Sequence, residues 1–152
     1  MHTITVFGTP APQGSKRHVG HGRLVESSPR LRPWREAVKQ AALDAMEAAS
    51  VKQYGGTGQR ALITLRGPLS VEIEFTFTKP KSAPKTRETW PITRSSGDLD
   101  KLCRGVLDGL ADSGLILDDS LVIDLAAAKR YTGQSGAMQV PGAVINVREV
   151  NA

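Results

Sequence analysis

The sequence is poor in cysteine and contains no long apolar run. Its single cysteine, Cys103, has no partner for a disulfide within the chain, which is typical of a reducing, intracellular setting. No apolar run is long enough to span a bilayer. The pattern of the N-terminus predicts a strand and not a secretory signal. We therefore expect a cytoplasmic protein without a membrane partner.

The length of 152 residues favours a single domain over 1–152 that buries a hydrophobic core. Helical spacing of apolar residues predicts helices from Pro33 to about Ser50 and from Asp98 to Ser113. In the second helix, Gly105 and Gly109 indicate close approach of another backbone. Alternation of apolar and β-branched residues predicts strands over 3–7, 69–78, 121–131 and 143–150.

The net charge of +5 favours a polyanionic partner, because binding to phosphates releases condensed counterions. Cations gather in two Pro-, Gly- and Ser-containing segments that we expect to be loops able to reach a partner. Lys16 and Arg17 belong to the first segment, and Lys81, Lys85 and Arg87 to the second, which precedes the predicted second helix. The alternative for each cation is an ordinary solvated surface position.

Four carboxylates stand close together in this otherwise basic chain: Asp98 and Asp100 at the predicted helix start, and Asp118 and Asp119 in the turn that follows the helix. Carboxylate oxygens are ligands for Mg²⁺, and two such ions can assist cleavage of a phosphodiester. We expect the two pairs to converge on bound metal. The alternative is purely local, because Asp98 suits a helix N-cap and the second pair suits a turn.

Specific motifs carry a resemblance to one family. Residues 98–110 resemble the Asp-x-Asp-Asn-Leu-x-Lys-x-x-Leu-Asp-Ala-Leu signature of RusA-type Holliday-junction resolvases, and residues 118–120 resemble their Asp-Asp-Ser/Ala-Gln motif. Lys129 matches a lysine found on their following strand, and residues 10–17 resemble their Pro-rich, cation-bearing N-terminal loop. The similarity runs over most of the chain.

The resemblance implies a small α+β fold, in which a mixed sheet of about four strands packs with two main helices. It also implies a homodimer that binds four-way DNA junctions and nicks them symmetrically with Mg²⁺, or with Mn²⁺ in its place. By motif position, Asp98, Asp100 and Asp119 would be the metal ligands, with Asp118 beside them and Arg104 assisting catalysis. The residues expected to bind DNA are Lys16, Arg17, Lys81, Lys85, Arg87, Lys101 and Lys129.

Two positions depart from the family signature. Lys101 replaces the usual Asn, and Arg104 replaces the usual Lys. Arginine keeps the charge but does not release its proton, so Arg104 serves only if the role is charge stabilisation. A junction-binding protein with impaired catalysis is therefore the alternative function. Because the family is widespread in phages and prophages, we expect a bacterial protein or a phage protein acting in the host cytoplasm.

Overall fold

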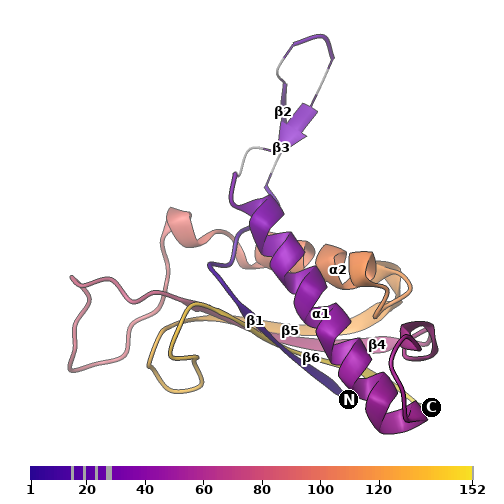
Figure 1. The fold of residues 1–152 in the computed structure, drawn as a ribbon. Coiled ribbons are helices and arrows are strands. Elements are labelled where there is room, and N and C mark those ends of the chain that lie inside the picture. The colour runs from indigo at the N-terminus through magenta and orange to yellow at the C-terminus, as the bar shows by residue number, and fades with distance from the viewer. Residues whose placement is uncertain (15, 19, 23, 27–28, 152) are drawn as a thin grey trace.

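A computed structural model describes residues 1–14, 16–18, 20–22, 24–26 and 29–151, without the side chains of 16–18 and 24–26. Two helices lie on one face of a four-stranded sheet, and a hairpin arm projects from one end (Figure 1). In chain order the elements are β1 (His2–Phe7), β2 (Lys16–His18), β3 (Leu24–Glu26), α1 (Leu31–Tyr54), β4 (Leu69–Phe77), α2 (Leu99–Ser113), β5 (Val122–Tyr131) and β6 (Gly142–Glu149), with 3₁₀ turns at Arg60–Leu62 (η1), Arg94–Ser96 (η2) and Asp119–Leu121 (η3).

The main sheet has the strand order β1-β6-β4-β5 and is mixed. β6 runs antiparallel to both β1 and β4, whereas β5 runs parallel to β4. The alternation in β4 buries Val71, Ile73 and Phe75 against the helices, because successive strand residues point to opposite faces. The predicted α+β fold is confirmed, and each predicted strand is present within a residue or two of its expected bounds.

The two helices approach each other closely at the glycines of α2. A Cβ built on Gly109 would lie 2.8 Å from Cγ1 of Val38 in α1, and one built on Gly105 would lie 3.4 Å from the carbonyl oxygen of Ala11. The predicted close backbone approach is confirmed at Gly109, where the new Cβ would also lie 3.3 Å from the carbonyl oxygen of Arg35, whereas the contacts at Gly105 are ordinary ones. Trp34, at the start of α1, is 2% exposed and anchors that helix in the core. This crossing fixes the position of α2 relative to the sheet.

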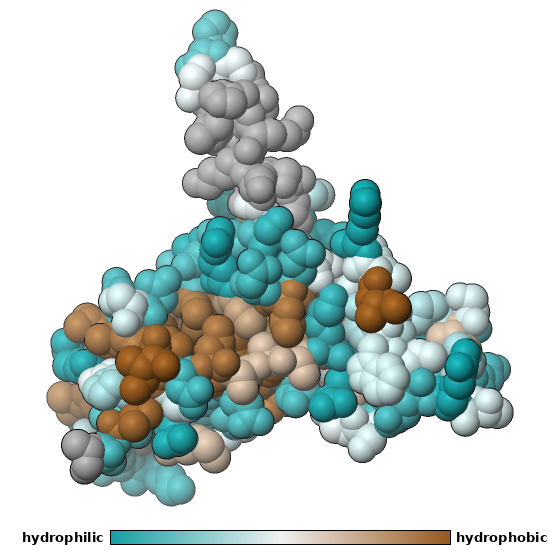
Figure 2. Space-filling view, turned by 180° about the vertical axis from the view of Figure 1, so that it is seen from behind, coloured by the Kyte–Doolittle hydropathy of each residue, from teal (hydrophilic) through white to brown (hydrophobic). Residues whose placement is uncertain are grey.

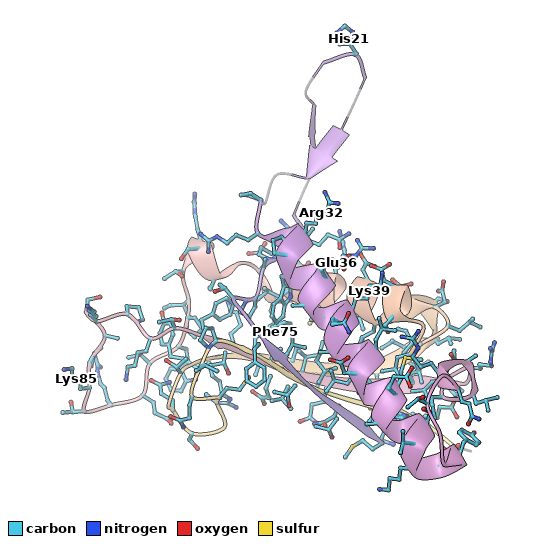
Figure 3. The ribbon with its side chains drawn as sticks, viewed as in Figure 1. His21, Arg32, Glu36, Lys39, Phe75 and Lys85 are labelled. Atoms are coloured by element: carbon cyan, nitrogen blue, oxygen red, sulfur yellow. The ribbon has the colours of Figure 1, made fainter. Side chains whose placement is uncertain are left out.

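The hairpin arm was not predicted, because its sequence has the composition of a loop. β2 and β3 pair antiparallel, with Lys16 opposite Glu26. His21 lies at the tip with a φ of 52°, between Gly20 and Gly22, which also have positive φ (Figure 3). Positive φ at a tight turn is the conformation that glycine adopts without strain. The short pairing therefore depends on this glycine-rich tip.

The long segment between β4 and α2 extends away from the sheet, and Lys85 lies near its outer end (Figure 3). Its return path is tied to the turn between β5 and β6. The amide of Gln134 donates to the carbonyl of Thr89 (2.6 Å), and the backbone N–H of Thr89 donates back to Gln134 Oε1 (3.1 Å). The expected cation-bearing loop is thus present and anchored at one end. No described helix is long and apolar enough to cross a membrane.

Candidate active site and nucleic-acid interface

The start of α2 is held by a lysine from the neighbouring strand. Lys129 Nζ donates to the carbonyl of Gly97 (2.8 Å) and to Ser96 Oγ (3.1 Å). Gly97 has a φ of 84°, and a Cβ there would lie 2.8 Å from the Pro12 ring, so only glycine suits this position. Two independent constraints, Lys129 and Pro12, therefore fix the backbone immediately before Asp98. Sequence reasoning gave Lys129 a contact with DNA and missed this structural role.

Asp98 and Asp100 emerge from this fixed turn. Asp98 occupies the N-cap position of α2 with an extended backbone, as the alternative interpretation predicts, but its side chain makes no capping hydrogen bond. Its Oδ2 lies 3.4 Å from Lys101 Nζ, and the side chain is 70% exposed. Asp100 is exposed in the first turn of the helix. Both carboxylates are accessible to a ligand, with the Lys101 ammonium beside one of them.

Asp118 and Asp119 begin the turn that leads into β5. Asp118 Oδ1 accepts a hydrogen bond from the backbone N–H of Ser120 (2.8 Å). Hydrogen bonds from Ser120 lower the pKa of Asp118, because they favour the charged carboxylate, and Asp119 contributes a smaller lowering. The predicted turn chemistry of this pair is confirmed. Asp119 itself is exposed.

The two acidic pairs lie at opposite ends of α2. The second pair lies beside Val122 at the start of β5, and the first pair lies beside Gly97, which Lys129 of β5 contacts. Seven residues of β5 separate Val122 from Lys129, a distance of ~23 Å at about 3.3 Å per residue. Within the part of the chain that the structure describes, no three His, Cys, Asp or Glu side chains gather closely enough to hold a metal ion. The expected convergence of both pairs within one chain is therefore wrong. Because β5 runs parallel to β4, it has to begin at the far end of the sheet.

The polar side of α2 is only partly exposed to solvent. Asp100 and Arg104 are exposed, but Asp108 is turned toward α1, where its Oδ2 lies 3.7 Å from Arg35 Nη1. Arg35 also binds Asp112 through two hydrogen bonds of 2.6 and 3.0 Å. This hydrogen bonding raises the pKa of Arg35 and lowers the pKa of Asp112. Asp108 therefore belongs to the helix–helix contact and not to the acidic site.

The remaining cations predicted to bind DNA divide into three groups. Lys81, Lys85 and Arg87 are exposed on the long loop, as expected for residues that reach a partner. Lys101 is paired with Asp98. The side chains of Lys16 and Arg17 lie outside the described residues, although their backbone belongs to the arm. Trp90, on the same long loop, is 50% exposed.

The edge of the sheet beside the acidic residues is apolar. β5 pairs with β4 on one side, and no described strand pairs with its other side. Ile123 is 65% exposed and Leu125 is 43% exposed. Leu117, in the segment before the strand, is 56% exposed. Figure 2 shows apolar side chains gathered on the view from behind, on the side that carries β5. Exposed edge strands of this kind are available for pairing with another strand.

Comparison with known proteins gives one finding. A family model described as Endodeoxyribonuclease RusA matches residues 8–141, which include both acidic pairs, the arm and the cation-bearing loop. The curated proteins contain no match to the chain.

Proposed function

The chain belongs to the RusA endodeoxyribonuclease family, and from this premise we propose that it resolves four-way DNA junctions by paired nicks with Mg²⁺ as cofactor. The observation that carries the proposal is the start of α2. There, two exposed aspartates follow a turn that Lys129 and Pro12 hold in place. Accessible carboxylates on a rigid element suit a hard divalent cation, because their separation does not change when the ion binds.

We propose that each metal site is shared between two copies of the chain. Asp98 and Asp100 of one copy and Asp119 of the second copy would hold the ion, with Asp118 of the second copy next to Asp119. A divalent ion there supplies an activated water and stabilises the leaving oxygen of the phosphodiester. The separation of the acidic pairs along α2 supports this division, because neither pair alone offers enough carboxylates.

The unpaired edge of β5 provides the way to join the two copies. Antiparallel pairing of two β5 strands about a two-fold axis keeps corresponding faces together. With Leu125 opposite its own equivalent, Val122 of one copy comes opposite Ala128 of the other. The Asp118–Leu121 turn of one copy then approaches the level of Lys129, which holds Gly97 in the other. This register also covers exposed Ile123 and sets Asp124 opposite Ala126, so that no like charges meet.

The surrounding cations have roles that follow from their positions. Arg104 lies on the exposed side of α2 one turn after Asp100. Because a guanidinium keeps its proton, Arg104 would stabilise charge on the scissile phosphate without transferring a proton. Lys81, Lys85 and Arg87, on the extended loop, would contact phosphates along a DNA arm. In a two-fold dimer these loops would be duplicated, which matches the symmetry of a four-way junction.

A second function is favoured by one contact. The ammonium of Lys101 lies 3.4 Å from Oδ2 of Asp98, where a metal ion would otherwise neutralise the carboxylate. An ammonium in that position competes with a cation, because both bind the same oxygen. If the competition is strong, the protein binds junctions without cutting them. This alternative predicts tight junction binding and no nicking at any concentration of Mg²⁺ or Mn²⁺.

The proposal is tested with a labelled synthetic four-way junction incubated with the protein in Mg²⁺ and, separately, in EDTA. We expect paired nicks in Mg²⁺ only. Asp100→Asn should abolish nicking and leave junction binding in EDTA unchanged or tighter. Asp44→Asn is the matched control, since Asp44 is an exposed aspartate on α1 that contacts Gln40. Unaltered nicking by Asp100→Asn would remove the start of α2 from the mechanism.

A further inference from the structure

Two arginines that have no role in the proposed metal site converge beside the start of α2. Arg30 directly precedes α1, and Arg94 begins η2, so they come from distant parts of the chain. Both line one depression of about 300 Å³, and Pro12, whose ring contacts Gly97, lines it as well. The start of α1, η2 and the start of α2 lie at the same end of the molecule (Figure 1). The depression therefore lies next to the turn from which Asp98 emerges.

The charge of this depression is not balanced within the part of the chain that the structure describes. Both arginines are exposed, and neither forms an ion pair with a described carboxylate. Two guanidinium groups on one small concave surface repel each other, and arginine does not lose its proton to relieve the repulsion. A bound anion relieves it. Phosphate suits a guanidinium best, because its oxygens accept paired hydrogen bonds.

Hydroxyl groups add further donors on the same surface. Ser95 lines this depression together with the two arginines, and it lines an adjoining depression of about 300 Å³ together with Arg30 and Thr93. Thr93 Oγ1 and Ser95 Oγ lie 3.0 Å apart and share one hydrogen bond. Only one of the two hydroxyl hydrogens is used in this contact, so the other can donate to a phosphate oxygen.

The turn that carries Arg94 is held in place without a ligand. Ser96 Oγ lies 2.9 Å from the carbonyl oxygen of Pro91 and 2.8 Å from that of Thr93. Lys129 Nζ donates to the same Ser96 hydroxyl. A preformed turn of this kind loses little conformational freedom when a ligand binds, so more of the contact energy is available for binding. It also holds a ligand at a fixed position relative to its surroundings.

We propose that Arg30 and Arg94 bind a phosphate of the DNA strand that is cut, close to the phosphate at Asp98 and Asp100. The inference rests on the proposed function. Ser95 lies three residues before Asp98, so their Cα atoms are at most about 11 Å apart. Phosphates follow one another at about 3.4 Å along the axis of each strand, which places the bound phosphate within about three nucleotides of the cleaved bond. Holding it there fixes the cleaved bond relative to the acidic residues.

The test removes the charge of one phosphate at a time and measures junction binding in EDTA. Each junction carries a single neutral methylphosphonate within about three nucleotides of the nick, or of the branch point if no nick forms. We expect one position to weaken wild-type binding about ten-fold, the loss expected for a charge-assisted hydrogen bond. Arg30→Gln and Arg94→Gln should each bind the unmodified junction about ten-fold more weakly and should no longer respond to the methylphosphonate at that position.

Arg148→Gln is the matched control. Arg148 is an exposed arginine that lies opposite Ser70 at the start of β4, whereas Lys129 lies opposite Phe75 toward the other end of that strand. This variant should keep the full methylphosphonate effect of the wild type. A second readout is the salt dependence of binding, because each lost phosphate contact lowers the slope of log affinity against log salt by about 0.9. Arg30→Gln and Arg94→Gln should show this decrease with unchanged unfolding in urea.

The outcomes separate this site from the proposed function. Methylphosphonate effects that are the same in the wild type, Arg30→Gln and Arg94→Gln at every position would overturn the phosphate site alone. If the wild type binds junctions without nicking them, the proposed cleavage fails, and the same comparison in EDTA still decides the phosphate site. Failure of the wild type to bind any junction would overturn the proposed function together with the site.

Discussion

Replacing Gly109 by alanine tests how closely α1 and α2 approach each other where they cross. The new Cβ would lie 2.8 Å from Cγ1 and 2.9 Å from Cβ of Val38, and 3.3 Å from the carbonyl oxygen of Arg35. Val38 is fully buried, and a valine in a helix has one strongly preferred rotamer, so it cannot turn away. Overpacking of this kind costs about 1–3 kcal/mol. The better helix propensity of alanine offsets about 1 kcal/mol.

We therefore expect Gly109→Ala to lower the free energy of unfolding by up to about 2 kcal/mol, the overpacking cost less the propensity gain, measured by urea titration. The melting temperature should fall by about 2–4 °C for each kcal/mol lost. Gly105→Ala is the matched control in the same helix, because its Cβ would make only ordinary contacts of 3.4 Å, and its stability should be unchanged or higher. In a Val38→Ala background the Gly109→Ala penalty should disappear. A Gly109→Ala protein more stable than wild type by about 1 kcal/mol, the gain that helix propensity alone would give, would refute the close crossing.

Three further outcomes follow from the contacts of single side chains. Lys129→Met removes the hydrogen bonds to Gly97 and Ser96. It should lower the free energy of unfolding in urea by about 1–2 kcal/mol and reduce nicking more than junction binding. Equal losses of nicking and binding would contradict the role of Lys129 in positioning Asp98. Arg35 lowers the pKa of Asp112, so the pair stabilises the fold at neutral pH, and this contribution is lost as pH falls through and below about 4. Asp112→Asn should therefore make the free energy of unfolding fall less steeply at acid pH. An unchanged pH dependence would argue against the pair. Lys101→Asn removes the ammonium beside Asp98 and should lower the Mg²⁺ concentration that gives half-maximal nicking, whereas a higher requirement would show that Lys101 assists the metal.

Local patterns predicted the elements of the fold well. The strict alternation of β4 and the helical spacing in α1 and α2 depend only on neighbouring residues, so they could be interpreted without the tertiary structure. The bounds of α1 were too narrow, because it begins at Leu31 and continues to Tyr54. The arm was missed because its strands are short. A three-residue pairing beside Gly20 and Gly22 leaves too short a pattern to recognise.

Properties that depend on distant parts of the chain were predicted less well. Nothing near Lys129 in the sequence indicates that it reaches Gly97, because this contact requires α2 to lie on β5. The same applies to Asp108, whose contact with Arg35 requires the crossing of α1 and α2. The two acidic pairs are close in sequence, yet they lie at opposite ends of the helix α2 that connects them. Closeness in sequence therefore suggested a proximity that the path of the chain does not provide.

The central claim is that each catalytic site takes its carboxylates from two copies of the chain. It is tested most directly with purified heterodimers that combine one Asp100→Asn subunit with one Asp119→Asn subunit, each carrying a different affinity tag. Homodimers of either variant should be inactive. In the heterodimer, one shared site carries both substitutions and the other carries neither, so we predict recovered nicking of a four-way junction on one strand only. A heterodimer that binds the junction but remains as inactive as both parents would contradict the shared site.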